Sequence, residues 1–74
     1  MIYLKNNNTI YPLIEELKMI SDTIYHLCIG NKKIIGSQNV EDIEFYFKEI
    51  QKQIEEGKTL INLNDVISYK KKDE

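Results

Sequence analysis

The chain has 74 residues and a formal net charge of −2, so we expect one small domain over residues 1–69 and a charged, frayed tail over residues 70–74. Arginine, alanine and tryptophan are absent, which excludes an arginine finger and bidentate guanidinium contacts to phosphate or guanine. Its one cysteine, Cys28, cannot form an internal disulfide, and no residues have the spacing of a four-ligand metal site. A packed core, a second copy of the chain or a partner must therefore stabilise the fold.

The N-terminal third predicts strands. Residues 2–5 suit a strand and residues 6–8, three asparagines, suit a turn. Two continuations are open from there. Residues 9–14 form the return strand of a hairpin, or Pro12 is the first residue of a short helix that ends near Ile20.

The middle of the chain predicts a β-hairpin. Residues 23–29 are mainly β-branched and aromatic and predict a strand, residues 32–37 predict its partner, and Gly30 and Asn31 separate the two. A two-residue loop with glycine first is typical of a type II′ turn. In that register Ile29 pairs with Lys32 and Leu27 pairs with Ile34.

The strongest element is a helix over residues 40–56. Asn39 suits the N-cap, Glu41 and Asp42 lie in the first turn where the helix dipole favours acids, and Gly57 suits the C′ position. Apolar residues recur at spacings of three and four on one stripe, which comprises Val40, Ile43, Phe47, Ile50 and Ile54.

The chain ends in a second predicted hairpin, with strands over residues 59–63 and 66–70 around the turn residues Asn64 and Asp65. Together these elements predict an α+β fold. We expect a small antiparallel sheet built from hairpins, with one long amphipathic helix over residues 40–56 packed across one face.

Catalysis has little support in the composition. His26 and Cys28 lie two apart on a predicted strand and so share a face, as in a thiolate–imidazole pair or half of a zinc site shared by two copies. A buried cysteine and a strand histidine explain the same pattern without chemistry. With one histidine and no arginine, the chain lacks most general bases and oxyanion stabilisers, so we expect no enzyme and no cofactor.

Phe45 is the residue that the helix pattern singles out for binding. It lies about 200° around the helix from Ile43, on the face opposite the apolar stripe and among charged residues. An aromatic anchor with a polar rim is typical of an interface hot spot. The predicted partner-binding surface comprises Phe45, Glu41, Asp42, Lys48, Glu49 and Lys52. The alternative is a single aromatic ring that lysine stems shield or the C-terminal hairpin covers.

A secondary surface is predicted at the first hairpin tip, over Asn31, Lys32 and Lys33. The two lysines and the lysine tail, residues 70–72, favour an alternative function in nucleic-acid binding. The negative net charge, the absence of arginine and the lack of a recognition motif disfavour it.

Residues 23–56 form a short hairpin that leads through Ser37, Gln38 and Asn39 into an acidic amphipathic helix. In architecture this stretch resembles small phage-encoded anti-CRISPR proteins, which implies an inhibitor that binds a bacterial defence protein. We therefore expect a small protein-interaction module that covers a partner's surface. A homodimer in which residues 66–70 pair at a sheet edge is compatible with this function.

The location of the protein follows from two further expectations. No apolar run approaches the ~20 residues that span a bilayer, and the sequence does not open with a signal peptide. We expect a cytoplasmic protein with a reduced Cys28 and no membrane partner.

Overall fold

The computed structural model describes residues 1–72, and side chains up to Lys70. In chain order the elements are β1 (Tyr3–Asn6), β2 (Thr9–Pro12), β3 (Leu17–Ser21), β4 (Tyr25–Ile29), β5 (Lys32–Ser37), α1 (Val40–Glu55), β6 (Leu60–Asn62) and α2 (Leu63–Lys72). The predicted α+β class is confirmed. The strands form two three-stranded sheets, β2-β1-β6 and β3-β4-β5, rather than the single sheet expected.

The sheet β3-β4-β5 contains the predicted hairpin. Gly30 has a φ of 60°, whereas the φ of Asn31 is not positive. A type II′ turn requires a positive φ at the first of its two central residues only. Ile29 pairs with Lys32 as predicted, but a β-bulge shifts the next pairs, so Leu27 lies opposite Ile35 and not Ile34. The bulge lets both isoleucines pack with the core.

The sheet β2-β1-β6 joins the two ends of the chain. β1 is antiparallel to β2 and parallel to β6, with Tyr3 opposite Leu60. The helix considered for residues 12–20 does not form. Residues 13–16 connect β2 to β3, and the backbone N–H of Leu13 donates to the carbonyl of Ile2. Sheet pairing at both ends of this segment outweighs its helix propensity.

The second predicted hairpin is wrong. Residues 66–70 lie in α2, because the Asn62 side chain caps its first turn by accepting from the N–H of Asn64 at 3.0 Å. Leu63 and Val66, three residues apart, both point into the core.

The predicted pairing of residues 66–70 with a second copy at a sheet edge is therefore wrong, because these residues are helical. α2 includes residues 70–72, so the expected tail boundary falls inside a helix, and residues 73–74 lie outside the described part.

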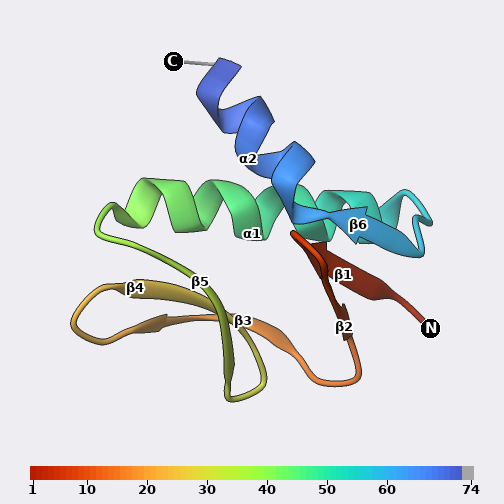
Figure 1. Ribbon diagram of the computed structural model, residues 1–74, viewed down its shortest axis with the longest axis horizontal. Helices are drawn as coiled ribbons and strands as arrows, with labels where there is room; N and C mark the ends of the chain where they lie inside the picture. The colour runs from red at the N-terminus through yellow and green to blue at the C-terminus, as the bar shows by residue number, and fades with distance from the viewer. Residues whose placement is uncertain (73–74) are drawn as a thin grey trace.

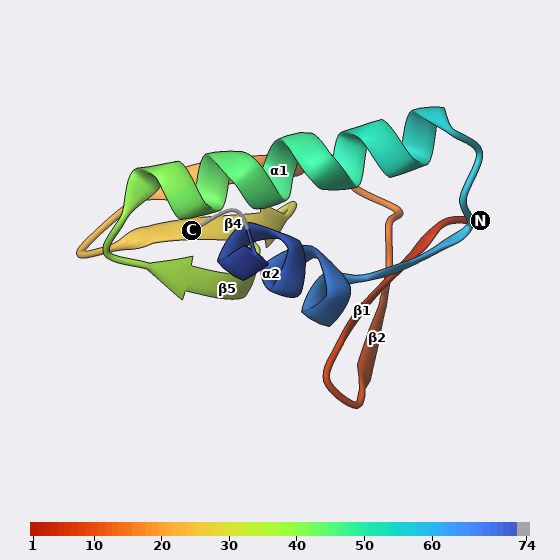
Figure 2. The same ribbon diagram turned by 90° about the horizontal axis from the view of Figure 1, so that it is seen from above.

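α1 begins at Val40 as predicted and ends at Glu55, one residue before the predicted end, and its buried face is rotated partly away from the predicted stripe. Ile43 and Ile50 of that stripe are buried and Phe47 and Ile54 pack against the core, whereas Val40 is exposed; Tyr46 and Gln53 are buried in addition. The rotation has a simple cause: α1 packs on the sheet β3-β4-β5 along one side and against α2 along another. Figures 1 and 2 show α1 spanning the molecule above this sheet, with α2 beside it. The buried residues of α1 therefore lie on the side of the helix that faces both the sheet β3-β4-β5 and α2.

One core unites both sheets and both helices. Its fully buried members include Leu4 and Ile61 from one sheet, Leu27 from the other, Ile50 from α1 and Val66 from α2. The β1–β2 hairpin extends sideways from this core in Figure 2. Neither helix in residues 1–72 has the length and apolar character needed to cross a membrane.

Candidate functional site

The structure divides the predicted surface on α1 into two parts. Glu41, Lys48 and Lys52 are exposed, as expected. Asp42 and Glu49 are half-buried and accept hydrogen bonds within the molecule. The Ser37 hydroxyl donates to Asp42 at 3.1 Å, and the Gln53 amide donates to Glu49 at 3.3 Å. These two acids therefore belong to the packed flank of α1 more than to its solvent face.

Phe45 lies on the same packed flank. Its half-buried ring packs against the core and meets the Tyr46 ring edge-on, with centroids 6.3 Å apart and an interplanar angle of 78°. The expectation of an exposed aromatic anchor at Phe45 is corrected here, because the buried stripe of α1 is centred near Tyr46 and reaches its neighbour. No charged surface with Phe45 at its middle forms.

The hairpin tip holds Asn31, Lys32 and Lys33 in exposed positions, as predicted. Both lysines have partners within the chain. The Lys33 ammonium lies 3.2 Å from the Asp22 carboxylate, and the Lys32 ammonium lies 4.8 Å from the centre of the Tyr11 ring. The hydrogen bond from Lys33 lowers the pKa of the Asp22 carboxyl. These contacts reduce the cationic surface that the tip offers to phosphate.

His26 and Cys28 do not form a reactive pair. Cys28 is fully buried on β4, between Lys18 and Lys33 on the neighbouring strands. Burial raises the pKa of its thiol, although both lysines oppose the shift, so the neutral form is favoured. His26 is half-buried beside Gly36. Within residues 1–72, no group of three or more histidine, cysteine or acidic side chains is placed to hold a metal ion.

One surface was missed at the sequence level: the outer side of the sheet β2-β1-β6. The residues of this side lie in two cross-strand rows, Pro12–Tyr3–Leu60 and Ile10–Lys5–Asn62. The intervening row, Tyr11–Leu4–Ile61, faces the core. We call the outer side, together with Met1 and Thr59, the open face.

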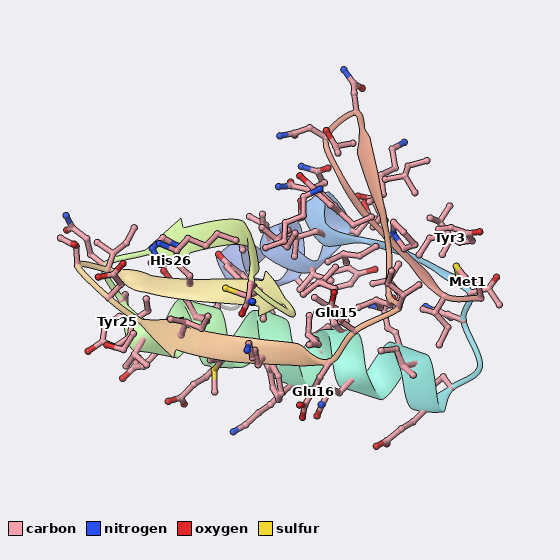
Figure 3. All side chains as sticks on the ribbon, turned by 90° about the horizontal axis from the view of Figure 1, so that it is seen from below. Met1, Tyr3, Glu15, Glu16, Tyr25 and His26 are labelled. Carbon is pink, nitrogen blue, oxygen red and sulfur yellow. The ribbon has the colours of Figure 1, made fainter. Side chains whose placement is uncertain are left out.

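Large apolar side chains gather on the open face. Met1, Tyr3, Ile10 and Leu60 are 73%, 39%, 55% and 54% exposed. With Thr59 they line a shallow depression of about 300 Å³. Figure 3 shows Met1 and Tyr3 together at one end of the molecule, with Tyr25 and His26 at the other. Half of the exposed large hydrophobic side chains of the described chain thus meet at one place.

The open face depends on contacts between distant parts of the sequence. The backbone N–H of Tyr3 donates to the carbonyl of Thr59 at 2.8 Å, next to the parallel pairing of β1 with β6. The alternation of Tyr3, Leu4 and Lys5 is a sequence signal for one exposed strand face. The sequence does not predict Leu60 beside this strand, because residues 59–63 suit a hairpin with residues 66–70.

Lys5 is the charged residue within the two rows of the open face. It lies on the central strand, β1, and its side chain is half-buried. In the part of the chain with described side chains, the ion pair formed is Lys33 with Asp22, so Lys5 has no acidic partner. The open face therefore combines an apolar surface with an unpaired cation.

A second, smaller depression of about 170 Å³ lies beyond β2. Its lining residues are Tyr11, Pro12, Ile14, Glu15, Ile29 and Lys32. The Lys32 ammonium already lies over the Tyr11 ring. Glu15 lies against Gly30, where a side chain in place of the glycine hydrogen would collide with it. The backbone N–H of Gly30 donates to the carbonyl of Glu16 at 2.9 Å, so the β4–β5 turn lies directly against the segment after β2.

In comparisons with known proteins, no family model matches this chain, and no curated protein or solved structure is significantly similar to it.

Proposed function

We propose that this chain is a small, non-enzymatic protein-interaction module that docks on a partner protein through its open face. One observation carries the proposal: Met1, Tyr3, Ile10 and Leu60 are all exposed and line a common depression. Contiguous apolar surface mostly marks interaction sites in folded proteins, whereas single exposed apolar residues are ordinary. Aromatic and aliphatic side chains in such positions supply most of the binding energy of an interface.

The proposal assigns no catalytic step to the chain. A raised pKa of the Cys28 thiol disfavours the thiolate that a nucleophile needs. Among the described side chains, none forms a hydrogen bond with His26 that would orient its ring toward the thiol. A lone thiol that stays reduced suits the cytoplasm, which we propose as the location.

Steric occlusion is the proposed mode of action. A domain with 4935 Å² of accessible surface can cover a partner's site with one face while the remainder stays in solvent. The hairpin-to-helix architecture of residues 23–56, similar to that of anti-CRISPR proteins, favours an inhibitor of a bacterial defence protein as the specific form of this function. The predicted helix surface around Phe45 is replaced in the proposal by the open face.

Site-specific photo-crosslinking tests the docking surface. A benzophenone amino acid replaces Leu60 on the open face in one variant and Gln51 on the exposed side of α1 in the control. We expect a discrete cross-linked protein from position 60 in host cells and not from position 51. The same products from both positions, or none from position 60, would contradict the proposal.

Nucleic-acid binding through Lys32 and Lys33 is tested separately. Titration of a labelled duplex and a labelled single strand at low and moderate salt measures phosphate binding directly, since such binding weakens steeply with ionic strength. We expect no saturable binding, because Lys33 is paired with Asp22 and Lys32 lies over Tyr11.

A further inference from the structure

We infer that the open face takes an extended acidic protein segment, whose carboxylate pairs with Lys5 while a neighbouring apolar side chain fills the depression beside Tyr3. This inference rests on the proposed function and names the chemistry of the partner. The remaining members of the depression, Ile10 and Leu60, flank these two positions on the adjacent strands.

The charge of Lys5 supports an acidic residue in the partner segment. Lys5 lies opposite Ile10 on one side and Asn62 on the other, so its cross-strand neighbours supply no negative charge. The Lys5 side chain is half-buried, and its ammonium has no acidic partner among the described side chains. A docking partner displaces water from this face, and a carboxylate then compensates the desolvation of the cation.

Strand geometry supplies the second step. Tyr3 and Lys5 are two residues apart on β1, and side chains two apart on a strand lie on the same side with a separation of about 6.6 Å. An extended ligand with an acidic and an apolar residue two positions apart matches this spacing. The depression of about 300 Å³ is lined by Met1, Thr59 and Leu60 in addition to Tyr3 and Ile10, and it suits a bulky apolar side chain.

The same charge disfavours a second copy of this chain as the occupant. β1 is the central strand of its sheet, so a two-fold axis through the middle of the open face, close to Lys5, brings the two Lys5 side chains together. Two half-buried like charges at the middle of an interface oppose association.

Peptide titration followed by amide chemical shifts tests the inference on the full chain. The probe is a short blocked peptide in which serines alternate with leucine, glutamate and leucine, and the control probe has lysine in place of glutamate. We expect saturable shifts on β1, β2 and β6 with the first probe. The lysine probe should bind at least about fivefold more weakly, a factor equivalent to ~1 kcal/mol.

Matched variants locate the charge that matters. Lys5→Gln removes the cation from the open face, and Lys48→Gln removes an equal charge from the solvent face of α1. We expect Lys5→Gln to weaken the glutamate probe about fivefold, as for loss of one partly buried ion pair, and Lys48→Gln to leave it unchanged. The amide spectrum of each variant reports directly whether the fold is intact.

Four outcomes overturn the inference. Equal affinity for the two probes, or no effect of Lys5→Gln on the affinity for the glutamate probe, contradicts an acidic partner. Concentration-dependent shifts on the open face without peptide assign it to a second copy. Saturable binding to anionic vesicles with the same set of shifts assigns it to a lipid surface. Cross-linking from position 60 distinguishes failure of this inference from failure of the proposed function. If position 60 captures a protein partner but Lys5→Gln has no effect, only the acidic character of the partner is contradicted.

Discussion

Asn7 and Asn64 exchange two hydrogen bonds across 57 positions of sequence. The backbone N–H of Asn7 donates to the Asn64 side-chain oxygen at 2.8 Å, and the Asn64 amide donates back to the Asn7 side-chain oxygen at 3.0 Å. Asn7 has a φ of 55°, a left-handed conformation that asparagine tolerates better than most residues. The pair attaches the β1–β2 turn to α2 and so supports the hairpin that carries half of the open face.

Replacement of Asn64 tests this attachment. Asn64→Ala removes both hydrogen bonds and is expected to lower the free energy of unfolding by about 1 kcal/mol, the low end for two exposed hydrogen bonds. Asn7→Gly keeps the backbone donor and the left-handed φ, so it should cost less. Urea denaturation measures both values. Asn8→Ala, at the adjacent exposed turn position, is the control, and a loss as large as that of Asn64→Ala would contradict the role of the pair.

Phe45 is expected to contribute to stability rather than to binding. Its half-buried ring packs on the core and against Tyr46, so Phe45→Ala should lower the free energy of unfolding by about 2 kcal/mol, less than for a fully buried phenylalanine. Val40→Ala, at an exposed position of the same helix, should cost under ~1 kcal/mol. Thermal and urea unfolding compare the two variants. An unchanged stability of Phe45→Ala would restore the exposed-anchor hypothesis.

Burial of the Cys28 thiol leads us to expect a loss of stability at alkaline pH. Burial raises the pKa of its thiol in the folded state, so the folded protein holds this proton more tightly than the unfolded chain does. The stabilisation is complete below the unfolded pKa, about 8.5, and declines as the pH rises toward the folded value. Urea denaturation between neutral pH and mildly alkaline pH should show this decline in the wild type. Cys28→Ala should show a smaller decline. If the free energy of unfolding falls equally with pH in both proteins, the prediction is wrong.

The ion pair of Asp22 and Lys33 predicts a titration shift at acid pH. The hydrogen bond from Lys33 lowers the pKa of the Asp22 carboxyl. The associated stabilisation is present above the unfolded pKa of about 3.9 and is lost as the pH falls through the folded value. A carbon-detected titration should place Asp22 below its ordinary value in the wild type. Lys33→Gln should raise the pKa of Asp22 toward that value, and Lys32→Gln is the matched control.

Local signals in the sequence were sufficient for α1 and for the β4–β5 hairpin. Asn39 accepts from the N–H of Glu41 at 3.0 Å, and Gly30 adopts the positive φ that the turn needs. Each of these signals acts within a few residues, so no knowledge of distant packing is required. The bulge at Ile34 was not predictable in this way, because it depends on which side chains the core accepts.

The C-terminal segment shows how local signals can conflict. Val66 and Ile67 are β-branched, and Asn64 and Asp65 are common in turns, which favoured a hairpin. Asn62 is an equally good N-cap, and Leu63 and Val66 have helical spacing. The core decides between the two, because a helix buries Leu63 and Val66 together while β6 pairs with β1. Tertiary burial outweighs propensities that differ by less than ~1 kcal/mol per residue.

The sequence by itself determined the α+β class, the start of the long helix at Val40 behind its cap Asn39, and the turn at Gly30 in the β4–β5 hairpin. Only the tertiary structure decided that the buried face of α1 extends beyond the predicted stripe to Tyr46, and that Phe45 packs against the core. It also decided that Tyr3 lies beside Leu60 on an exposed sheet face around Lys5. Helix caps and tight turns are set by neighbours in sequence, whereas a surface assembled from both ends of the chain exists only once the strands have paired.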